Sequence, residues 1–197
     1  MRVVCGTRDA LFVLDDIVRK RRRGERVYMG FLDIEKAYPS VWWEGMWWKL
    51  RQMGITGRML AALRSFYTKC ECAVRVGGRA DDWFSDKVGV RQGCPLSPLL
   101  FALYINEFAK QIKSSGGNVK VGDTRLGLLM FADDIVLLAD SQAGLQRSLE
   151  LAWRYSRRWR FNFNLGKDKS EVMVLGGQVP GEKFFLGEGQ MKVVREY

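Results

Sequence analysis

Residues 128–139 constrain the fold more than any other stretch, because two adjacent carboxylates, Asp133 and Asp134, interrupt an otherwise apolar run. Apolar runs of this length on both sides of a polar pair predict two buried strands joined by a tight turn. Ionised carboxylates beside buried strands carry a large desolvation cost unless a cation or hydrogen-bond donors compensate it. A bound metal ion would explain the pair. A polar turn between strands is the alternative, and the pair alone does not decide between them.

A third carboxylate ends a second apolar run. Residues 27–32 form a nearly continuous apolar segment, typical of a strand buried on both faces, and Asp33 follows directly. If this strand neighbours the predicted hairpin, Asp33 lies near Asp133 and Asp134. Three converging acids suit a pair of divalent ions, and oxygen ligands favour magnesium or manganese over zinc. Such a site would activate an attacking oxygen and neutralise a leaving pyrophosphate in phosphoryl transfer.

Composition removes several other chemistries. The chain contains no histidine, which excludes a Ser-His-Asp triad, an imidazole base and any histidine-containing zinc site. Its four cysteines lack the paired spacing of a zinc ribbon, so we expect reduced, mostly buried thiols. The 32 basic and 22 acidic residues give a net charge of +10. This surplus points first to nucleic acid as a partner, with a merely basic surface as the alternative.

The 197 residues are expected to form one domain of the α+β class, with a mixed or antiparallel sheet and helices packed on one face. Tryptophans 42, 43, 47 and 48 are expected in the core. Helices are predicted at 9–23, 41–53, 56–67, 99–112 and 142–160. Strands are predicted at 27–32, 70–76, 83–90, 171–175 and 183–186 and on both sides of the acidic pair, with a glycine turn joining 70–76 to 83–90.

No apolar run approaches the roughly 18–20 residues that a membrane span requires. Acidic residues occur as early as Asp9, which is untypical of a signal peptide. We therefore expect an intracellular protein without a membrane partner, and the pattern does not distinguish nucleus from cytoplasm.

Three segments resemble, in order, the central motifs of reverse transcriptases. They read FLDIEKAY at 31–38, RQGCPLSPLLF at 91–101 and FADD at 131–134. The resemblance is nearest to polymerases of non-LTR, LINE-type retrotransposons and extends over about residues 6–177. It implies an RNA-directed DNA polymerase palm. About 1–26 would be the end of the fingers, and about 27–197 a palm that stops before the thumb.

The resemblance also implies the metal ligands. Asp33 and Asp133 match the principal ligands, Asp134 matches the third acid, and the backbone carbonyl of Ile34 is an additional ligand. The implied cofactors are two Mg²⁺ ions, with Mn²⁺ as a possible substitute. Lys169 matches a lysine proposed to donate a proton to the pyrophosphate or to contact phosphate, and Lys167 is a close rival.

Further positions match nucleotide-binding elements of the family. Tyr38 corresponds to the bulky aromatic that excludes a ribose 2′-hydroxyl, and a plain core aromatic is the alternative reading. Gln92 and Gly93 match the segment that contacts the incoming nucleotide and the template, and Arg2 could contact a triphosphate. The implied partners are an RNA template, a DNA primer and deoxynucleoside triphosphates. Arginines in 19–23 and 147–160 would attract the nucleic-acid backbone.

The sequence departs from the family pattern in two ways. Pro39 stands where related elements commonly have an acidic residue, and it is expected to reshape the start of the next helix. The upstream fingers and the thumb are not visible, which indicates a piece of a longer polyprotein. A catalytically inactive nucleic-acid-binding remnant is therefore the main alternative. A related palm, from a group II intron maturase or an RNA-dependent RNA polymerase, is a third reading.

Overall fold

A computed structural model describes residues 7–20, 25–68, 71–73, 75–80, 84–85, 88–115, 117–121, 123–166, 168–176 and 181–194. Its internal contacts divide the chain into two compact units. We call residues 1–35 with 106–197 the sheet unit and residues 36–105 the insert unit. This division does not follow the expected boundary near residue 26, and the assignment of segments to fingers and palm stays a prediction.

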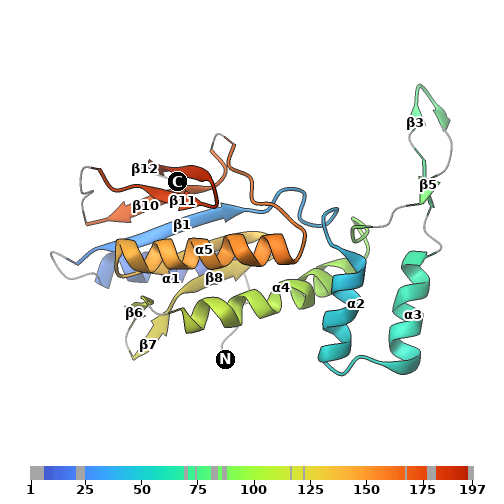
Figure 1. Ribbon diagram of the computed structural model, residues 1–197, viewed down its shortest axis with the longest axis horizontal. Helices are drawn as coiled ribbons and strands as arrows, with labels where there is room; N and C mark the ends of the chain where they lie inside the picture. The colour runs from blue at the N-terminus through green and yellow to red at the C-terminus, as the bar shows by residue number, and fades with distance from the viewer. Residues whose placement is uncertain are drawn as a thin grey trace. The chain divides into compact units, whose positions relative to one another are not determined.

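The sheet unit is built on a six-stranded sheet with the order β11-β12-β10-β1-β9-β8 (Figure 1). The strands are β1 (Val27–Asp33), β8 (Leu128–Phe131), β9 (Asp134–Ala139), β10 (Glu171–Leu175), β11 (Phe184–Leu186) and β12 (Gly189–Val194). Neighbouring strands are antiparallel except β10 and β12, which are parallel. The predicted α+β class with a mixed sheet is confirmed.

Helices of the sheet unit lie on both faces of this sheet. Leu145 and Leu149 of α5 (Gln142–Arg158) lie over Gly30, where an added Cβ would meet Leu145 Cδ1 at 3.2 Å. Ile17 of α1 (Thr7–Lys20) instead belongs to a buried cluster with Met29. Successive residues of a strand point to opposite faces. Packing of α5 on one face therefore agrees with the expectation, and α1 adds a helix on the other face.

The contact of α5 with β1 gives a stability prediction. Leu149 is fully buried, so Leu149→Ala should lower the free energy of unfolding by about 2–5 kcal/mol, the usual range for removing a buried leucine side chain. Phe12→Ala on α1, where the side chain is 72% exposed, is the control and should change it by less than about 0.5 kcal/mol. Urea unfolding followed by circular dichroism measures both, and equal effects would contradict the assigned core.

The insert unit contains α2 (Trp43–Gln52), α3 (Gly57–Thr68) and the start of α4 (Ser97–Ser114), which ends in the sheet unit. Trp43 and Trp47 of α2 both contact the Tyr67 ring edge-on, with ring centroids 5.7 and 5.8 Å apart. Trp47 is buried, as expected for a core tryptophan, but Trp48 is 46% exposed. The expectation that all four tryptophans are core is wrong for Trp48, because it lies on the outer side of the helix.

Four two-residue strands form the hairpin region of the insert unit: β2 (Glu71–Cys72), β3 (Arg75–Val76), β4 (Arg79–Ala80) and β5 (Phe84–Ser85). β3 pairs with β4 across Gly77 and Gly78, both of which have positive φ, so the predicted glycine turn is confirmed. The single strand predicted over 83–90 is wrong. Of its described residues, Phe84 and Ser85 form β5, which pairs with β2, and Val88 forms an isolated bridge to Trp42, whereas Gly89 and Val90 belong to no strand.

Several boundaries and elements differ from the sequence expectations. The hairpin β6 (Val119–Val121) with β7 (Thr124–Leu126) and the strand β12 were not predicted. Helix α1 is described to Lys20, and the predicted remainder to residue 23 lies outside the described residues. Cys94 is a free, half-buried thiol. In the part of the chain that the structure describes, no helix is long and apolar enough to cross a membrane.

Candidate active site

The pairing of β1 with β9 brings two of the predicted carboxylates face to face. Asp33, the last residue of β1, is directly opposite Asp134, the first residue of β9. Directly opposed residues of an antiparallel pair project from the same face. Asp133 precedes Asp134 in the two-residue turn between β8 and β9, where Ala132 has a φ of 53°. The predicted hairpin is confirmed, and its turn lies beside the end of β1.

The surroundings of Asp134 disfavour the ionised form of its side chain. Asp134 is exposed, yet partial desolvation raises the pKa of its carboxyl above the usual range, and the neighbouring carboxylates Asp133 and Asp33 raise it further. Both causes disfavour the ionised carboxylate, desolvation by removing water and the neighbours by like-charge repulsion. A cation bound at this position would oppose both effects.

The segment after α5 holds Asp33 in place, and we call residues 161–166 and 168–170 the cradle. The Asp33 backbone N–H donates to Ser170 Oγ at 3.0 Å, and the Asn164 N–H donates to the Asp33 carbonyl at 2.8 Å. The next two residues of the chain are also held, because Ile34 bridges to Phe163 and the Glu35 N–H donates to the Asn162 carbonyl. The cradle therefore continues the sheet around the end of β1.

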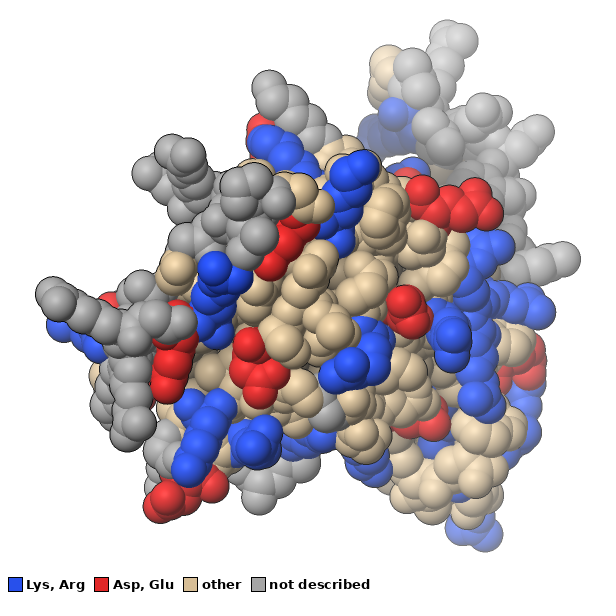
Figure 2. Space-filling model, turned by 60° about the vertical axis from the view of Figure 1, so that its left-hand side comes forward, with Lys and Arg blue, Asp and Glu red and all other residues tan. Residues whose placement is uncertain are grey.

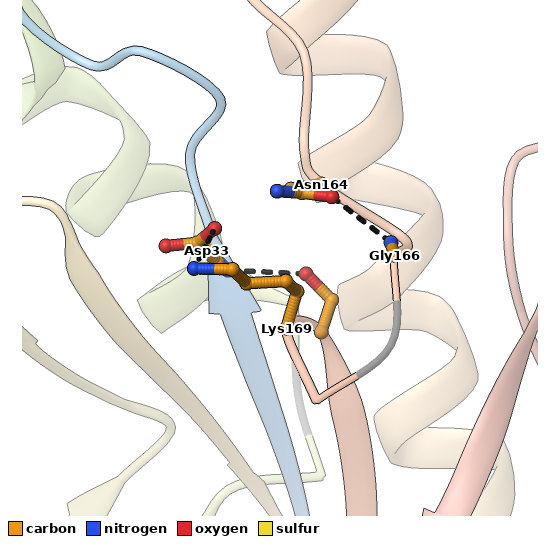
Figure 3. Close-up of polar contacts among 5 residues, drawn as sticks. Asp33, Asn164, Gly166 and Lys169 are labelled. Carbon is orange, nitrogen blue, oxygen red and sulfur yellow. Dashed lines mark hydrogen bonds and ion pairs between the residues drawn. The ribbon is translucent and has the colours of Figure 1, made fainter.

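Lys169 lies beside Asp33 in the same cradle. Its Nζ is 3.7 Å from Asp33 Oδ2, and about half of its side chain is exposed (Figure 3). A turn at residues 164–166 of the cradle is held by the Asn164 side chain, whose Oδ1 accepts from the Gly166 N–H at 2.9 Å. The structure thus places the predicted Lys169 next to a predicted metal ligand, whereas Lys167 lies outside the described residues.

Sequence reasoning missed Ser170 and Asn164 as parts of this site. A serine directly before an apolar strand and an asparagine two residues before a glycine are common turn signals, which carry no functional information by themselves. Only the pairing of Asp33 with the cradle reveals their role.

In the insert unit, Tyr38 is half-buried, and its ring lies 5.4 Å from that of Phe101 between centroids. The Tyr38 carbonyl accepts from the Val90 N–H at 2.8 Å. Pro39 follows within a turn, and α2 begins four residues later at Trp43. A Cβ at Gly89, where φ is +92°, would lie 3.1 Å from the Pro39 backbone, so the two segments meet through a glycine.

The other predicted nucleotide contacts in the insert unit are accessible. Gln92 and Gly93 are both exposed, in the loop before α4. Gly93 has a φ of +80°, and an added Cβ would meet nothing within 4 Å. Its backbone conformation, rather than crowding within the protein, therefore favours glycine here. Arg2 lies outside the described residues.

The donor set fits a divalent cation in its chemistry. Asp33, Asp133 and Asp134 provide only oxygen ligands, which suit magnesium or manganese. Two of these carboxylates share one rung of the ladder, and the third is adjacent in the chain. No three acidic or cysteine side chains among the described residues lie close enough together to hold a metal ion as they stand. The fit therefore rests on donor type and strand position.

The solved structures with a similar fold include telomerases. The chain superposes on apo telomerase from Candida tropicalis, truncated from its C-terminal domain, with a TM-score of 0.65 and 18% identity, over 91% of this chain and 37% of that one. The fold is therefore that of a palm-type polymerase, with the opposed carboxylates at the end of β1 and the start of β9, beside the turn that follows β8.

Sequence comparison identifies the family. The model for "Reverse transcriptase (RNA-dependent DNA polymerase)" matches residues 4–190, and the chain belongs to this family. Its relatives are polyproteins of non-LTR retrotransposons. It is 33% identical over 133 residues to the type-1 element R2 polyprotein of Nasonia vitripennis, covering 68% of this chain and 13% of that protein. It is 30% identical over 186 residues to the type-2 element R2DM polyprotein of Drosophila melanogaster, covering 94% and 17%. The chain thus spans less than a fifth of either relative.

Proposed function

We propose that the chain is the catalytic palm region of an RNA-directed DNA polymerase that adds deoxynucleotides to a primer 3′-hydroxyl. The observation that carries this proposal is the register of β1 with β9, which opposes Asp33 and Asp134 beside the turn that holds Asp133. Membership of the reverse transcriptase family supports the same reaction.

The proposed site consists of oxygen ligands for metal ions and one lysine side chain, Lys169. Asp33, Asp133, Asp134 and the carbonyl of Ile34 would hold two Mg²⁺ ions, or Mn²⁺ in their place. When bound, the ions would supply activation of the primer hydroxyl and neutralisation of the pyrophosphate charge. Lys169, 3.7 Å from Asp33, is suited to contact a phosphate or to donate a proton to the leaving pyrophosphate.

Residues of the insert unit would select the nucleotide. Tyr38 would close the space beside the sugar 2′-carbon, and its packing on Phe101 would keep the ring in place. Gln92 and Gly93 would contact the incoming nucleotide and template from their exposed loop. Arg2 is proposed as a triphosphate contact on the resemblance alone.

Attraction of the RNA template and DNA primer would come from basic side chains. Lysines and arginines are interspersed with carboxylates on the face in Figure 2. The exposed arginines of α5 lie with that helix on the sheet face opposite Asp33, because α5 packs over Gly30. Helix α1 packs on the sheet face that carries Asp33, and we assign part of the attraction of the nucleic-acid backbone to the basic run at 19–23, of which Arg19 has an exposed side chain.

Primer extension on an RNA template tests this function. The 197-residue chain, deoxynucleotides and Mg²⁺ or Mn²⁺ should extend a DNA primer, and Asp133→Ala should abolish extension because a metal ligand is lost. Asp123→Ala is the matched control. This exposed carboxylate precedes β7, away from the opposed pair, and its removal should leave extension unchanged.

The alternative, an inactive nucleic-acid-binding remnant, predicts a different result. Wild type and Asp133→Ala would then both fail to extend the primer, yet both would bind primer–template with an affinity that falls steeply with salt. A chain that extends an RNA primer with ribonucleotides in preference to deoxynucleotides would favour the RNA-dependent RNA polymerase reading instead.

A further inference from the structure

We propose that Ser170 is a positioning residue that fixes the backbone of Asp33 for metal binding; this inference rests on the proposed function. The two ladders of β1 end at different places. On the β9 side, pairing continues to Asp33 opposite Asp134. On the β10 side, it ends two residues earlier, at Phe31 opposite Glu171. Asp33 therefore has no ladder partner on the β10 side.

The Ser170 side chain takes the place of the missing ladder bond. Its Oγ accepts the Asp33 N–H at 3.0 Å, while the Asp33 carbonyl accepts the Asn164 N–H at 2.8 Å. Ser170 is only 3% exposed, so water has little access to replace it as the acceptor. Of these two bonds, only the one to Ser170 depends on a side chain, and a substitution can remove it alone.

The position of Ser170 is itself fixed from both sides. Lys192 of β12 lies 3.6 Å from Asp168 Oδ1 and 3.1 Å from Glu171 Oε1, on either side of Lys169 and Ser170. Glu171 also pairs in register with Phe31 of β1. The hydroxyl therefore acts from a restrained segment, and a restrained acceptor can fix the peptide plane of its donor.

Fixing this peptide plane sets the direction of the Asp33 side chain. The peptide planes on both sides of the Asp33 Cα, held by the Ser170 and Asn164 bonds, together fix the Cα–Cβ vector and so restrict the directions in which the carboxylate can point. Without the bond, the Asp33 N–H loses its acceptor and the carbonyl bond to Asn164 is left to hold this edge at residue 33, which favours local fraying. Ser170 would thus contribute to metal affinity without touching metal or substrate.

Amide hydrogen exchange measured by NMR tests the bond itself. Ser170→Ala should speed exchange at the Asp33 amide by about tenfold or more, while Met29 on the same strand keeps its rate. Ser170→Thr keeps the hydroxyl and should behave as wild type. Ser156→Ala is the matched control, because its buried Oγ donates to the Trp153 carbonyl within α5. Uniform acceleration along β1, or an unchanged Asp33 rate, would overturn the inference.

Manganese binding tests the consequence, with free Mn²⁺ followed by electron paramagnetic resonance. Ser170→Ala should weaken Mn²⁺ binding about tenfold, because it removes the hydrogen bond that holds the Asp33 backbone. Ser170→Thr and Ser156→Ala should bind Mn²⁺ as tightly as the wild type. Wild-type affinity in Ser170→Ala would overturn this inference alone. The proposed function fails, and the inference with it, if the wild-type chain does not bind Mn²⁺ or if Asp33→Asn leaves Mn²⁺ binding unchanged.

Discussion

Asp33→Asn is expected to lower the rate of nucleotide addition by about a thousandfold or more, because the amide removes a negative charge from the proposed metal site. Asparagine has nearly the same shape as aspartate, so the backbone bonds of residue 33 to Ser170 and Asn164 should persist. Single-turnover addition of one deoxynucleotide measures the loss. Binding of the primer–template should change little, since this carboxylate does not attract polyanions.

The matched control for this prediction is Asp123→Asn, which removes the same charge from an exposed position. It should add nucleotides at the wild-type rate. A rate for Asp33→Asn within about tenfold of wild type would show that residue 33 is not a metal ligand, whatever the other acids do.

Tyr38→Ala is expected to raise the use of ribonucleotides relative to deoxynucleotides by about tenfold to a hundredfold, the discrimination that a single shape contact provides. The side chain packs on Phe101 and is half-buried, so truncation opens space while the surrounding turn is held by the Tyr38 carbonyl bond to Val90. The ratio of kcat/KM for ATP and dATP on one template measures the change.

Tyr38→Phe serves as the control because it keeps the ring and removes only the hydroxyl. It should preserve the wild-type ratio. If Tyr38→Ala also leaves the ratio unchanged, Tyr38 is the plain core aromatic that its sequence position equally allows.

Local patterns predicted the elements that carry the acids. The apolar runs on both sides of Asp133 and Asp134 form β8 and β9, and the apolar run before Asp33 is β1. Such runs report burial directly, because a chain cannot expose them at low cost. Whether Asp33 meets the hairpin depends on strand order, which no local pattern contains. From the sequence, Asp33 could therefore be predicted to lie near Asp133 and Asp134 only if the two segments were neighbours in the sheet.

The parts that escaped prediction depend on long-range contacts or on short elements. Two-residue strands such as β3 and β4 carry too few residues to show a period. The face that α1 covers follows from the packing of Ile17 in a buried cluster with Leu129 and Leu138, which joins distant parts of the sequence. Ser170 matters only because the β10 ladder stops short of Asp33. The role of Ser170 thus depends on the register of β1 with β10, which the amino-acid composition does not reveal.

The central claim is that this chain transfers nucleotides through divalent cations held at the Asp33 and Asp134 pair. The most direct measurement follows deoxynucleotide addition on an RNA template by the wild-type chain in Mg²⁺, after excess EDTA, and after Mg²⁺ or Mn²⁺ is restored. We predict that the chain adds deoxynucleotides in Mg²⁺, that excess EDTA abolishes addition completely, and that either Mg²⁺ or Mn²⁺ restores it. Addition that persists in EDTA, or its absence in all three conditions from folded protein that binds primer–template, would contradict the claim.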